Sequence, residues 1–467
     1  MDESKSTDEL LIELTPGGGA LRHQLATAIA AAVRDGRLRA GARLPSTRDL
    51  ALQLRVSRGV VTDAYAHLAA QGFLETSPRL APVVATVVGS TEDDAPEPSP
   101  RPPRYDFTPT SPDVGLFPRD VWRKALDRAL RTTPDAELDY GDRQGSETLR
   151  AALVERLGRT RGVDTTRRRI VVVQGFAQGL DVICAVLARR GTGRIAIEDP
   201  ALDDAVKTAR LAGMTVIGVP VDAEGIDVDA LAATRADAVL VTPAHQFPTG
   251  VVLSPDRRRA LLDWARSTGS LIVEDDYDAE FRHDGPPLGA LQRLAPEHVA
   301  YVGTASKILA PALRLGWLAL PASMVAEAAD AKWCRDSGSP VLDQVALAHV
   351  LTRGDFDRSL RRALRSYRHR RDRLVAELAR QLPEARISGA AAGLHVVAIF
   401  DDLDETALVE FAEQRRVSLR GLRSYAVEPT AHATSDAAIA LGYGRLPEPS
   451  ITDAVQALTE AARAVRS

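Results

Sequence analysis

Short apolar runs alternate with longer amphipathic stretches through most of the chain after residue 105. The runs are rich in β-branched side chains and are found at Ile170–Val173, Arg194–Ile197, Thr215–Val219, Ala238–Val241, Leu271–Val273 and Val299–Val302. Strands of a parallel sheet are buried on both faces and are joined by crossover helices, so this order predicts βαβ units around a mostly parallel sheet. The fold class expected for this part of the chain is α/β.

The N-terminal part of the chain has a helical pattern instead. Apolar residues recur at helical spacing over 21–35, which predicts an amphipathic helix. Ser46 and Ser57 stand where N-caps of two shorter helices would stand, with only a tight turn between those helices. We expect the last helix to end at Gly72 and the apolar run Val83–Val88 to supply a strand of a small wing.

A proline-rich segment separates these two patterns. Residues 91–104 read TEDDAPEPSPRPPR and offer almost nothing to bury. Such a composition is typical of an extended, semi-rigid spacer of about 3.1 Å per residue. The sequence therefore predicts an N-terminal module at 10–90, a linker at 91–104 and a large domain at 105–467.

Composition narrows the class of protein. With 59 basic and 63 acidic residues the net charge is −4, and every apolar run is shorter than the ~18 residues that span a bilayer. The N-terminus is polar and acidic, unlike a secretory signal. Cys184 and Cys334 are too few for a disulfide scaffold or a four-cysteine zinc site. We expect a cytoplasmic protein with no membrane segment and no metal site.

The N-terminal module is basic although the whole chain is acidic. Residues 20–80 contain nine arginines and four acids. Arg58 and Thr62 lie one helical turn apart, on the side of the helix opposite Val61 and Tyr65, so they could enter a major groove while the apolar side packs. The alternative is a helical protein-docking module whose arginines are only solvated.

A longer string favours DNA. The segment LPSTRDLALQLRVSRGVVTDAYAHLAAQG resembles the winged helix-turn-helix of the GntR family of bacterial transcription regulators. The resemblance implies that double-stranded operator DNA is contacted by four residues, Arg48, Ser57, Arg58 and Thr62. Two features depart from the family pattern: Gly59 stands where a threonine is usual, and the wing segment PRLAPV lacks the usual glycines.

Lysine is scarce, which makes one lysine conspicuous. Of the 59 basic residues only five are lysines, namely Lys5, Lys124, Lys207, Lys307 and Lys332. A guanidinium cannot form a Schiff base, so covalent amine chemistry requires a lysine. Lys307 follows an apolar strand and has Thr304, Ser306 and Arg314 nearby in sequence, the residue types that bind the phosphate of pyridoxal phosphate. The alternative is a solvated lysine at the end of a strand.

Upstream, the string LIVEDDYDAEF places carboxylates and a phenol at the end of a buried strand. A pyridine nitrogen needs a carboxylate such as Asp275 to stay protonated, and the ring oxygen needs a donor such as Tyr277. The alternative is magnesium binding by Glu274, Asp275 and Asp276, although no phosphate-binding P-loop accompanies them.

These strings resemble fold-type I aminotransferases, and the order of the modules resembles the MocR subfamily of GntR regulators. The resemblance extends over nearly the whole chain, including LDYGDRQGSETLRAAL, VVVQGFAQGLD and TPAHQFPTG. It implies a smaller C-terminal α/β subdomain and pyridoxal 5'-phosphate as cofactor. The residues it assigns to the cofactor are Lys307 for the internal aldimine, Asp275 for the ring nitrogen, Tyr277 for the ring oxygen, and Thr304, Ser306, Arg314 and the backbone of Gly175 and Phe176 for the phosphate. Tyr140 would reach the phosphate of a neighbouring subunit, which implies a homodimer.

Three departures from the aminotransferase pattern bear on function. Leu202 replaces the aromatic residue that stacks on the ring, and Phe247 replaces the asparagine that contacts the ring oxygen, a role left to His245 or Gln246. Ala440 stands where relatives have the arginine that binds an amino acid's carboxylate. Arg423 and Arg445 are the candidates to replace it.

The sequence thus predicts a pyridoxal phosphate-dependent, DNA-binding transcription regulator. Its aldimine at Lys307 would sense either pyridoxal phosphate itself or an amine or amino acid as a small-molecule effector. One alternative is an active aminotransferase that carries a DNA-binding module. Another is a DNA-binding protein whose large domain has lost its cofactor. The loss of the arginine at Ala440 disfavours the first, so no catalytic residue is assigned, and the retained Lys307 disfavours the second.

Overall fold

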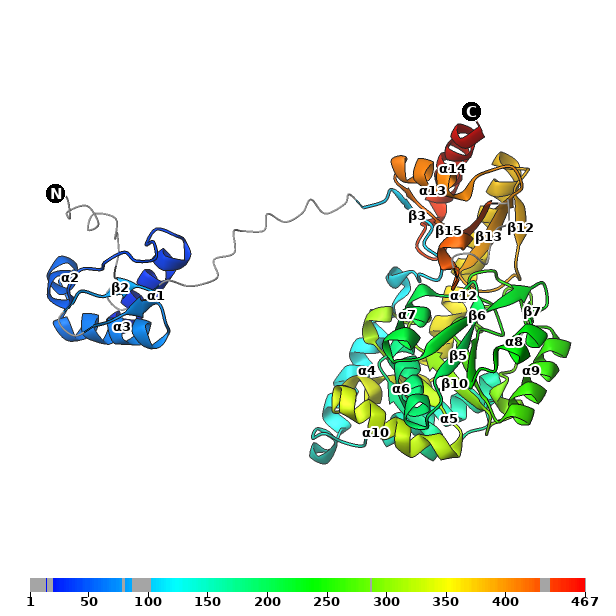
Figure 1. Ribbon diagram of the computed structural model, residues 1–467, viewed down its shortest axis with the longest axis horizontal. Helices are drawn as coiled ribbons and strands as arrows, with labels where there is room; N and C mark the ends of the chain where they lie inside the picture. The colour runs from blue at the N-terminus through cyan, green and yellow to red at the C-terminus, as the bar shows by residue number, and fades with distance from the viewer. Residues whose placement is uncertain are drawn as a thin grey trace. The chain divides into compact units, whose positions relative to one another are not determined.

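The computed structural model describes residue 14 and residues 20–77, 80–85, 102–285, 288–428 and 437–466. Among these residues no helix has both the length and the apolar character needed to cross a membrane. The chain divides into two compact units, Met1–Arg101 and Pro102–Ser467 (Figure 1). Most of the predicted linker and residues 86–88 of the predicted wing strand lie outside the described residues.

The first unit is a small helical module with a two-stranded wing. Its elements are α1 (Leu21–Arg34), α2 (Thr47–Leu54), α3 (Arg58–Ala70), β1 (Leu74–Glu75) and β2 (Val83–Val84), and the two strands pair antiparallel. The expected caps are confirmed, because Ser46 Oγ accepts the N–H of Asp49 at 3.2 Å and Ser57 Oγ accepts that of Val60 at 3.4 Å. The apolar stripe of α1 packs into one core with Val61 and Leu68 of α3.

The second unit is built on an eight-stranded sheet in the order β4-β11-β10-β9-β8-β5-β6-β7. The strands are β4 (Ile170–Val173), β5 (Arg194–Asp199), β6 (Thr215–Asp222), β7 (Gly225–Ile226), β8 (Ala238–Val241), β9 (Leu271–Asp276), β10 (Val299–Thr304) and β11 (Gly316–Ala319). The strands β10, β9, β8, β5 and β6 run parallel, whereas β11 and β7 are antiparallel to their neighbours. The predicted mostly parallel sheet is confirmed.

Helices cover both faces of this sheet, as Figure 1 shows for α6, α8 and α9. They are α4 (Arg119–Thr132), α5 (Glu147–Arg161), α6 (Phe176–Arg189), α7 (Asp203–Leu211), α8 (Val228–Thr234), α9 (Pro255–Thr268), α10 (Val325–Asp336) and α11 (Val341–Thr352). Alternate residues of each strand pack on opposite faces. In β5, for example, Ile197 packs with α6 and α7 while Ala196 packs with α8 and α9.

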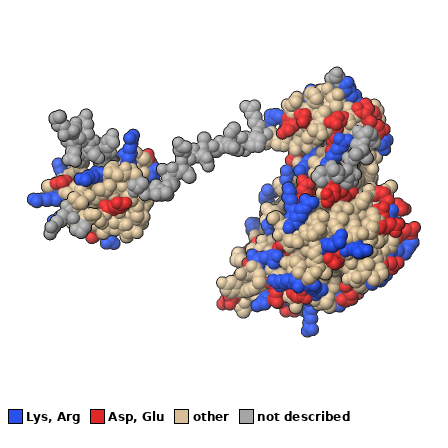
Figure 2. Space-filling view, in the orientation of Figure 1, with Lys and Arg blue, Asp and Glu red and all other residues tan. Residues whose placement is uncertain are grey.

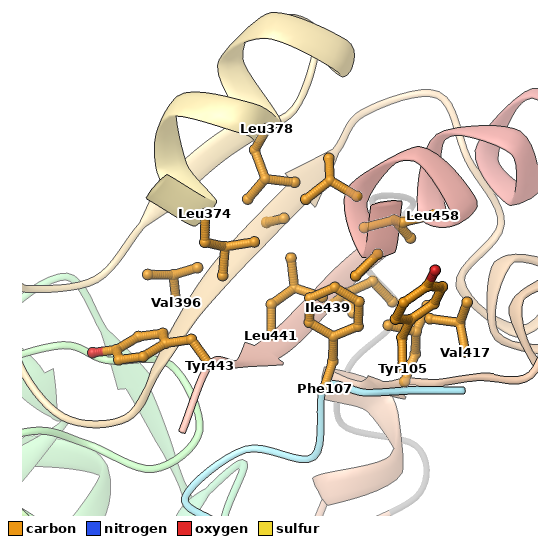
Figure 3. Close-up of a cluster of buried hydrophobic side chains, with 14 of the residues drawn as sticks. Tyr105, Phe107, Leu374, Leu378, Val396, Val417, Ile439, Leu441, Tyr443 and Leu458 are labelled. Atoms are coloured by element: carbon orange, nitrogen blue, oxygen red, sulfur yellow. The ribbon is translucent and has the colours of Figure 1, made fainter. Parts of the chain in front are cut away.

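The expected C-terminal subdomain is also present. It has an antiparallel sheet in the order β12 (Arg386–Ser388), β13 (His395–Phe400), β16 (Ala437–Gly442) and β15 (Arg420–Gly421), with helices α12 (Asp355–Gln381), α13 (Glu405–Gln414) and α14 (Ile451–Arg466). The first strand of the unit, β3 (Tyr105–Asp106), pairs in parallel with β14 (Val417–Ser418). Figure 3 shows Tyr105 and Phe107 in the buried cluster of this subdomain, together with Ile439, Leu441 and Leu458.

Candidate functional site

The carboxyl ends of the parallel strands open into a pocket of about 250 Å³. Ligands bind at this edge of open α/β sheets because the crossover connections diverge there. The pocket is lined by Thr110, Phe176, Ala177, Ile197, Glu198, Ala201, Leu202, Asp204, Ala205, Leu240, Thr242, Phe247, Asp275, Tyr277, Thr304, Ser306, Lys307, Pro311 and Arg314. Seven of the predicted cofactor residues are therefore brought together, and Gly175 lies directly before Phe176.

One end of the pocket is suited to an anion. Arg314 Nη2 donates to the carbonyl of Gln174 at 2.6 Å, and a Cβ added to Gly175, whose φ is +89°, would lie 3.0 Å from the same nitrogen. Thr304 and Ser306 lie beside it, with their hydroxyl oxygens 2.8 Å apart. The N–H groups in the first turn of α6 have no partner within the helix. Together these groups have the chemistry of a phosphate-binding site.

Asp275 is the only one of three consecutive acidic residues that lines the pocket. Glu274 accepts the N–H groups of Leu291 and Gln292 at 2.9 and 3.0 Å, and Asp276 pairs with Arg161 at 2.5 Å. Neighbouring side chains of a strand point to opposite faces, so the carboxylates do not converge on one point as magnesium binding requires. In the described part of the chain, no group of His, Cys, Asp or Glu side chains is arranged to hold a metal ion.

The environment of Asp275 is unusual for a carboxyl group. Its Oδ1 atom is buried and has no hydrogen-bond partner among the described residues. Burial raises the pKa of Asp275 well above its usual value, and the charge of Asp276 adds to this effect. A buried acceptor without a partner is costly, so this atom points to a missing donor in the pocket.

Lys307 has the environment of a reactive amine. It lies in the turn after β10 and is largely enclosed by the pocket. Burial lowers the pKa of its amine, and the negative charges of Asp278 and Asp275 oppose that effect. A lowered pKa increases the fraction of neutral amine, which is the nucleophilic form.

Tyr277 is held by a buried network behind the pocket. Its hydroxyl donates to the carbonyl of His245 at 3.0 Å, and His245 Nδ1 lies 2.9 Å from Asp278 Oδ2. Burial raises the pKa of Tyr277 well above its usual value, so the phenol is protonated and able to donate. Phe247 packs edge-on against this ring. Of the two suggested substitutes for an asparagine, His245 contacts Tyr277, whereas Gln246 bonds to Pro200 and Thr249 in the wall.

Sequence reasoning missed two polar residues of the pocket, Glu198 and Thr110. Glu198 is the last residue but one of β5, accepts hydrogen bonds from the hydroxyl and the N–H of Thr242, and has a pKa raised to about 7 by burial. Thr110 lines the pocket with a φ of +59°, rare for a β-branched residue. The signal for Glu198 was present, because it follows a predicted parallel strand. Thr110 comes from a segment far from the sheet in sequence and gave no such signal.

Tyr140 lies apart from this pocket. Its side chain is exposed, its ring packs edge-on against Trp333, and it lines another cavity of about 630 Å³ between residues 137–147 and 337–344. Within one chain it therefore does not meet Lys307. Its expected contact with a neighbouring subunit stays a prediction.

In the first unit the four predicted DNA-contacting residues lie on α2 and α3. Arg58 opens α3, with its Nε 3.3 Å from Thr47 Oγ1, and Thr62 donates its hydroxyl to the carbonyl of Arg58 at 2.9 Å. Arg48 is exposed on α2, and the hydroxyl of Ser57 caps α3. Basic side chains project from the face of this unit that is in view in Figure 2. The arrangement presents arginines at the start of a helix, where recognition helices contact DNA.

Comparison with known families agrees with both halves of this description. The profile "Bacterial regulatory proteins, gntR family" matches residues 21–84, and "Aminotransferase class I and II" matches residues 112–434. The pyridoxine biosynthesis transcriptional regulator PdxR of Corynebacterium glutamicum is 31% identical, over 92% of this chain and 93% of that protein. The probable rhizopine catabolism regulatory protein MocR of Rhizobium meliloti is 29% identical, over 96% of this chain and 94% of its own.

The chain belongs to the MocR subfamily of GntR-family transcriptional regulators. Among solved structures, the α-aminoadipate aminotransferase LysN of Thermus thermophilus matches with a TM-score of 0.68 and 25% identity, over 77% of this chain and 92% of that one. LysN was solved with N-(5'-phosphopyridoxyl)-L-leucine. The regulator's second unit thus has the aminotransferase fold.

Ala440 stands where the aminotransferase pattern leads one to expect an arginine that binds a carboxylate. Its side chain is buried in β16 and offers no group to a carboxylate. Of the suggested substitutes, Arg445 pairs with Asp106 at 3.0 Å, and Arg423 lies 4.0 Å from Asp404. Neither is among the residues that line the pocket, although the positive charge of Arg445 contributes to lowering the pKa of Lys307.

Proposed function

We propose that this MocR-type regulator binds operator DNA through α2 and α3 and senses a small molecule through pyridoxal phosphate held at Lys307. The observation that carries the proposal is that one chain combines a helix-turn-helix with a pocket in which Lys307, Asp275 and Arg314 converge. A protein that acts on operator DNA works in the cytoplasm, and the enzymes of this fold suggest a homodimer.

The residues of the pocket fit pyridoxal phosphate. Arg314, Gly175 and the first turn of α6 would hold the phosphate, and the unpartnered Oδ1 of Asp275 would accept the hydrogen of a protonated ring nitrogen. The match to the aminotransferase family supports the same cofactor. When bound, pyridoxal phosphate supplies an aldehyde that combines reversibly with primary amines.

The chain's own residues prepare the pocket for that chemistry. Burial keeps a fraction of the Lys307 amine neutral, and burial also keeps Tyr277 protonated, so its hydroxyl can turn from the carbonyl of His245 and donate to the ring oxygen instead. Leu202 and Phe247 supply apolar walls that exclude water. The pocket is therefore built to hold the cofactor and admit a second amine.

Loss of the arginine that would bind a substrate carboxylate, at Ala440, distinguishes a sensor from an aminotransferase. A charge-assisted pair between arginine and carboxylate contributes roughly 1.5–3 kcal/mol, and Ala440 cannot make it. We therefore assign the pocket to sensing, with either the cofactor itself or an amino compound as the signal. The retained Lys307, Asp275 and Tyr277 keep transamination as the second candidate.

The test measures cofactor binding and operator affinity on the same protein. Lys307→Ala should abolish the visible absorbance of the bound cofactor and any dependence of operator affinity on it, while Lys207→Ala, on the surface of α7, should retain both. Operator affinity of the protein with and without pyridoxal phosphate should differ by about fivefold or more, the usual range of allosteric coupling. Equal affinities in the presence and absence of cofactor and amino compounds, with turnover of an amino acid, would favour the enzyme instead.

A further inference from the structure

The position opposite Ala440 holds an arginine. In the antiparallel pairing of β15 with β16, Arg420 is the direct partner of Ala440. Directly opposed residues of antiparallel strands place their side chains on the same face, with Cβ atoms about 5 Å apart. The guanidinium missing from β16 is therefore present on the neighbouring strand.

The Arg420 side chain reaches the rim of the pocket. Its Nη2 lies 3.2 Å from Asp203 Oδ2, at the start of α7. The residues on either side of Asp203, Leu202 and Asp204, both line the pocket. The side chain of Arg420 is 46% exposed, so a ligand can reach it.

Aromatic packing fixes this arginine against the pocket wall. The guanidinium lies over the ring of Tyr425, 5.0 Å from its centroid, and that ring packs edge-on against Phe247, which lines the pocket, with centroids 5.1 Å apart. Ala201, another lining residue, donates its N–H to the carbonyl of Tyr425 at 2.9 Å. The segment from Arg420 to Tyr425 is thus a second layer of the pocket wall.

The other arginines near the pocket have different partners. Arg445 forms an ion pair with Asp106. Arg314 donates to the carbonyl of Gln174, at the end of the pocket that is suited to a phosphate. Arg420 differs because its partner Asp203 stands between two residues that line the pocket, Leu202 and Asp204, so that an anion in the pocket can replace Asp203 as its partner.

We propose that Arg420 recognises the anionic group of an amino-compound effector, with Asp203 as its partner in the absence of ligand. The ligand class is a primary amine that also carries a carboxylate or similar anion. The amine would enter toward Lys307, and its anion would exchange with Asp203 for the guanidinium. The proposal rests on the proposed function, because the effector is sensed in the same pocket.

The test uses the full chain reconstituted with pyridoxal phosphate. Binding of L-alanine, β-alanine and ethylamine is followed by the visible absorbance of the cofactor. Ethylamine is what remains of either amino acid when its carboxylate is removed, so it isolates the anion's contribution. At least one of the two amino acids should bind roughly tenfold or more tightly than ethylamine.

Variants assign that preference to a residue. Arg420→Gln should remove it and leave ethylamine binding unchanged, whereas Arg445→Gln, a matched loss of an exposed arginine, should retain it. Asp203→Asn frees Arg420 and should strengthen binding of the amino acid but not of ethylamine.

Two results would overturn the proposal: ethylamine binding as tightly as both amino acids, or a preference that survives in Arg420→Gln. Failure of the proposed function has a different signature, because no visible absorbance that depends on Lys307 would then appear in the wild-type protein.

Discussion

Gly175 and Arg314 lie so close that a Cβ at position 175 would push against the guanidinium. That Cβ would be 3.0 Å from Arg314 Nη2 and 3.2 Å from its Cζ, and the backbone there has a φ of +89°. The start of α6 and the guanidinium are therefore packed directly against each other at the end of the pocket that is suited to an anion. The absence of a side chain at Gly175 is as much a part of the site as the guanidinium.

Gly175→Ala should weaken pyridoxal phosphate binding by about tenfold or more, because the new Cβ displaces Arg314. Gly191→Ala is the control for a Cβ at a positive φ, since Gly191 has a φ of +79° and nothing within 4 Å of an added Cβ. Position 175 has a φ of +89° and a ψ of −176°, a region that essentially only glycine adopts, so Gly175→Ala carries a backbone cost of roughly 1–3 kcal/mol in addition to the contact with Arg314. Cofactor titration by absorbance measures both variants. Equal losses of affinity in the two would mean that the effect does not arise at the anion-binding end of the pocket.

Glu198→Gln should change how stability depends on pH in the cofactor-free protein. Burial raises the pKa of Glu198 to about 7, so the folded state favours the protonated form. Ionisation of Glu198 therefore destabilises the folded state progressively as the pH rises from about 4.3, the pKa of glutamate in the unfolded chain, to about 7. The variant should therefore gain up to about 3 kcal/mol relative to wild type between about pH 5 and about pH 8.

Urea unfolding followed by circular dichroism at the two pH values checks this expectation. Glu147→Gln, at an exposed carboxyl paired with Arg167, is the control and should follow wild type. A Glu198→Gln variant that also follows wild type at both pH values would show that Glu198 folds with an ordinary pKa.

Arg58→Ala should weaken specific operator binding by about 1–3 kcal/mol, because the start of a recognition helix contacts base edges and phosphates. Arg37→Ala removes the same charge from an arginine that pairs with Asp35. Fluorescence anisotropy at fixed salt, with an operator selected from random DNA, compares the two. If both variants lose the same affinity, Arg58 contributes only charge.

Tyr140 can be tested by mixing chains. If it reaches the phosphate of a neighbouring subunit, a dimer of one Lys307→Ala chain and one Tyr140→Ala chain contains one complete pocket. That pocket combines Lys307 of the second chain with Tyr140 of the first. Differently tagged chains, purified as mixed dimers, should bind one cofactor per dimer with wild-type affinity. Affinity equal to that of the Tyr140→Ala homodimer would contradict a role across the interface.

The parts of this fold that follow from local sequence were predictable. Apolar, β-branched runs marked the parallel strands, and Ser46 and Ser57 marked the starts of two helices, because these signals lie within a few neighbouring residues. That Asp275 and Lys307 line one pocket was predictable for a related reason. The carboxyl ends of parallel strands lie at the same edge of a sheet. Asp275, near the end of β9, and Lys307, just after β10, were therefore expected at that edge.

Features that depend on non-local pairing were not predictable. The insertion of β11 between β4 and β10 is set by contacts across the sheet rather than by the pattern of its own four residues. The register that places Arg420 opposite Ala440 is of the same kind. Sequence motifs therefore show that β16 lacks the expected arginine, whereas the arginine opposite Ala440 becomes apparent only from the pairing of β15 with β16.

The route by which the chain enters the second unit has a mechanical consequence. Tyr105 and Asp106 pair with β14 of the C-terminal subdomain, and Phe107 accepts the N–H of Gly442 at 2.8 Å. Three residues later Thr110 lines the pocket. The segment by which the chain enters the second unit is thus held by the C-terminal subdomain and reaches the pocket within a few residues. A shift of that subdomain against the central sheet would carry residues 105–107 with it and would therefore move the pocket wall at Thr110.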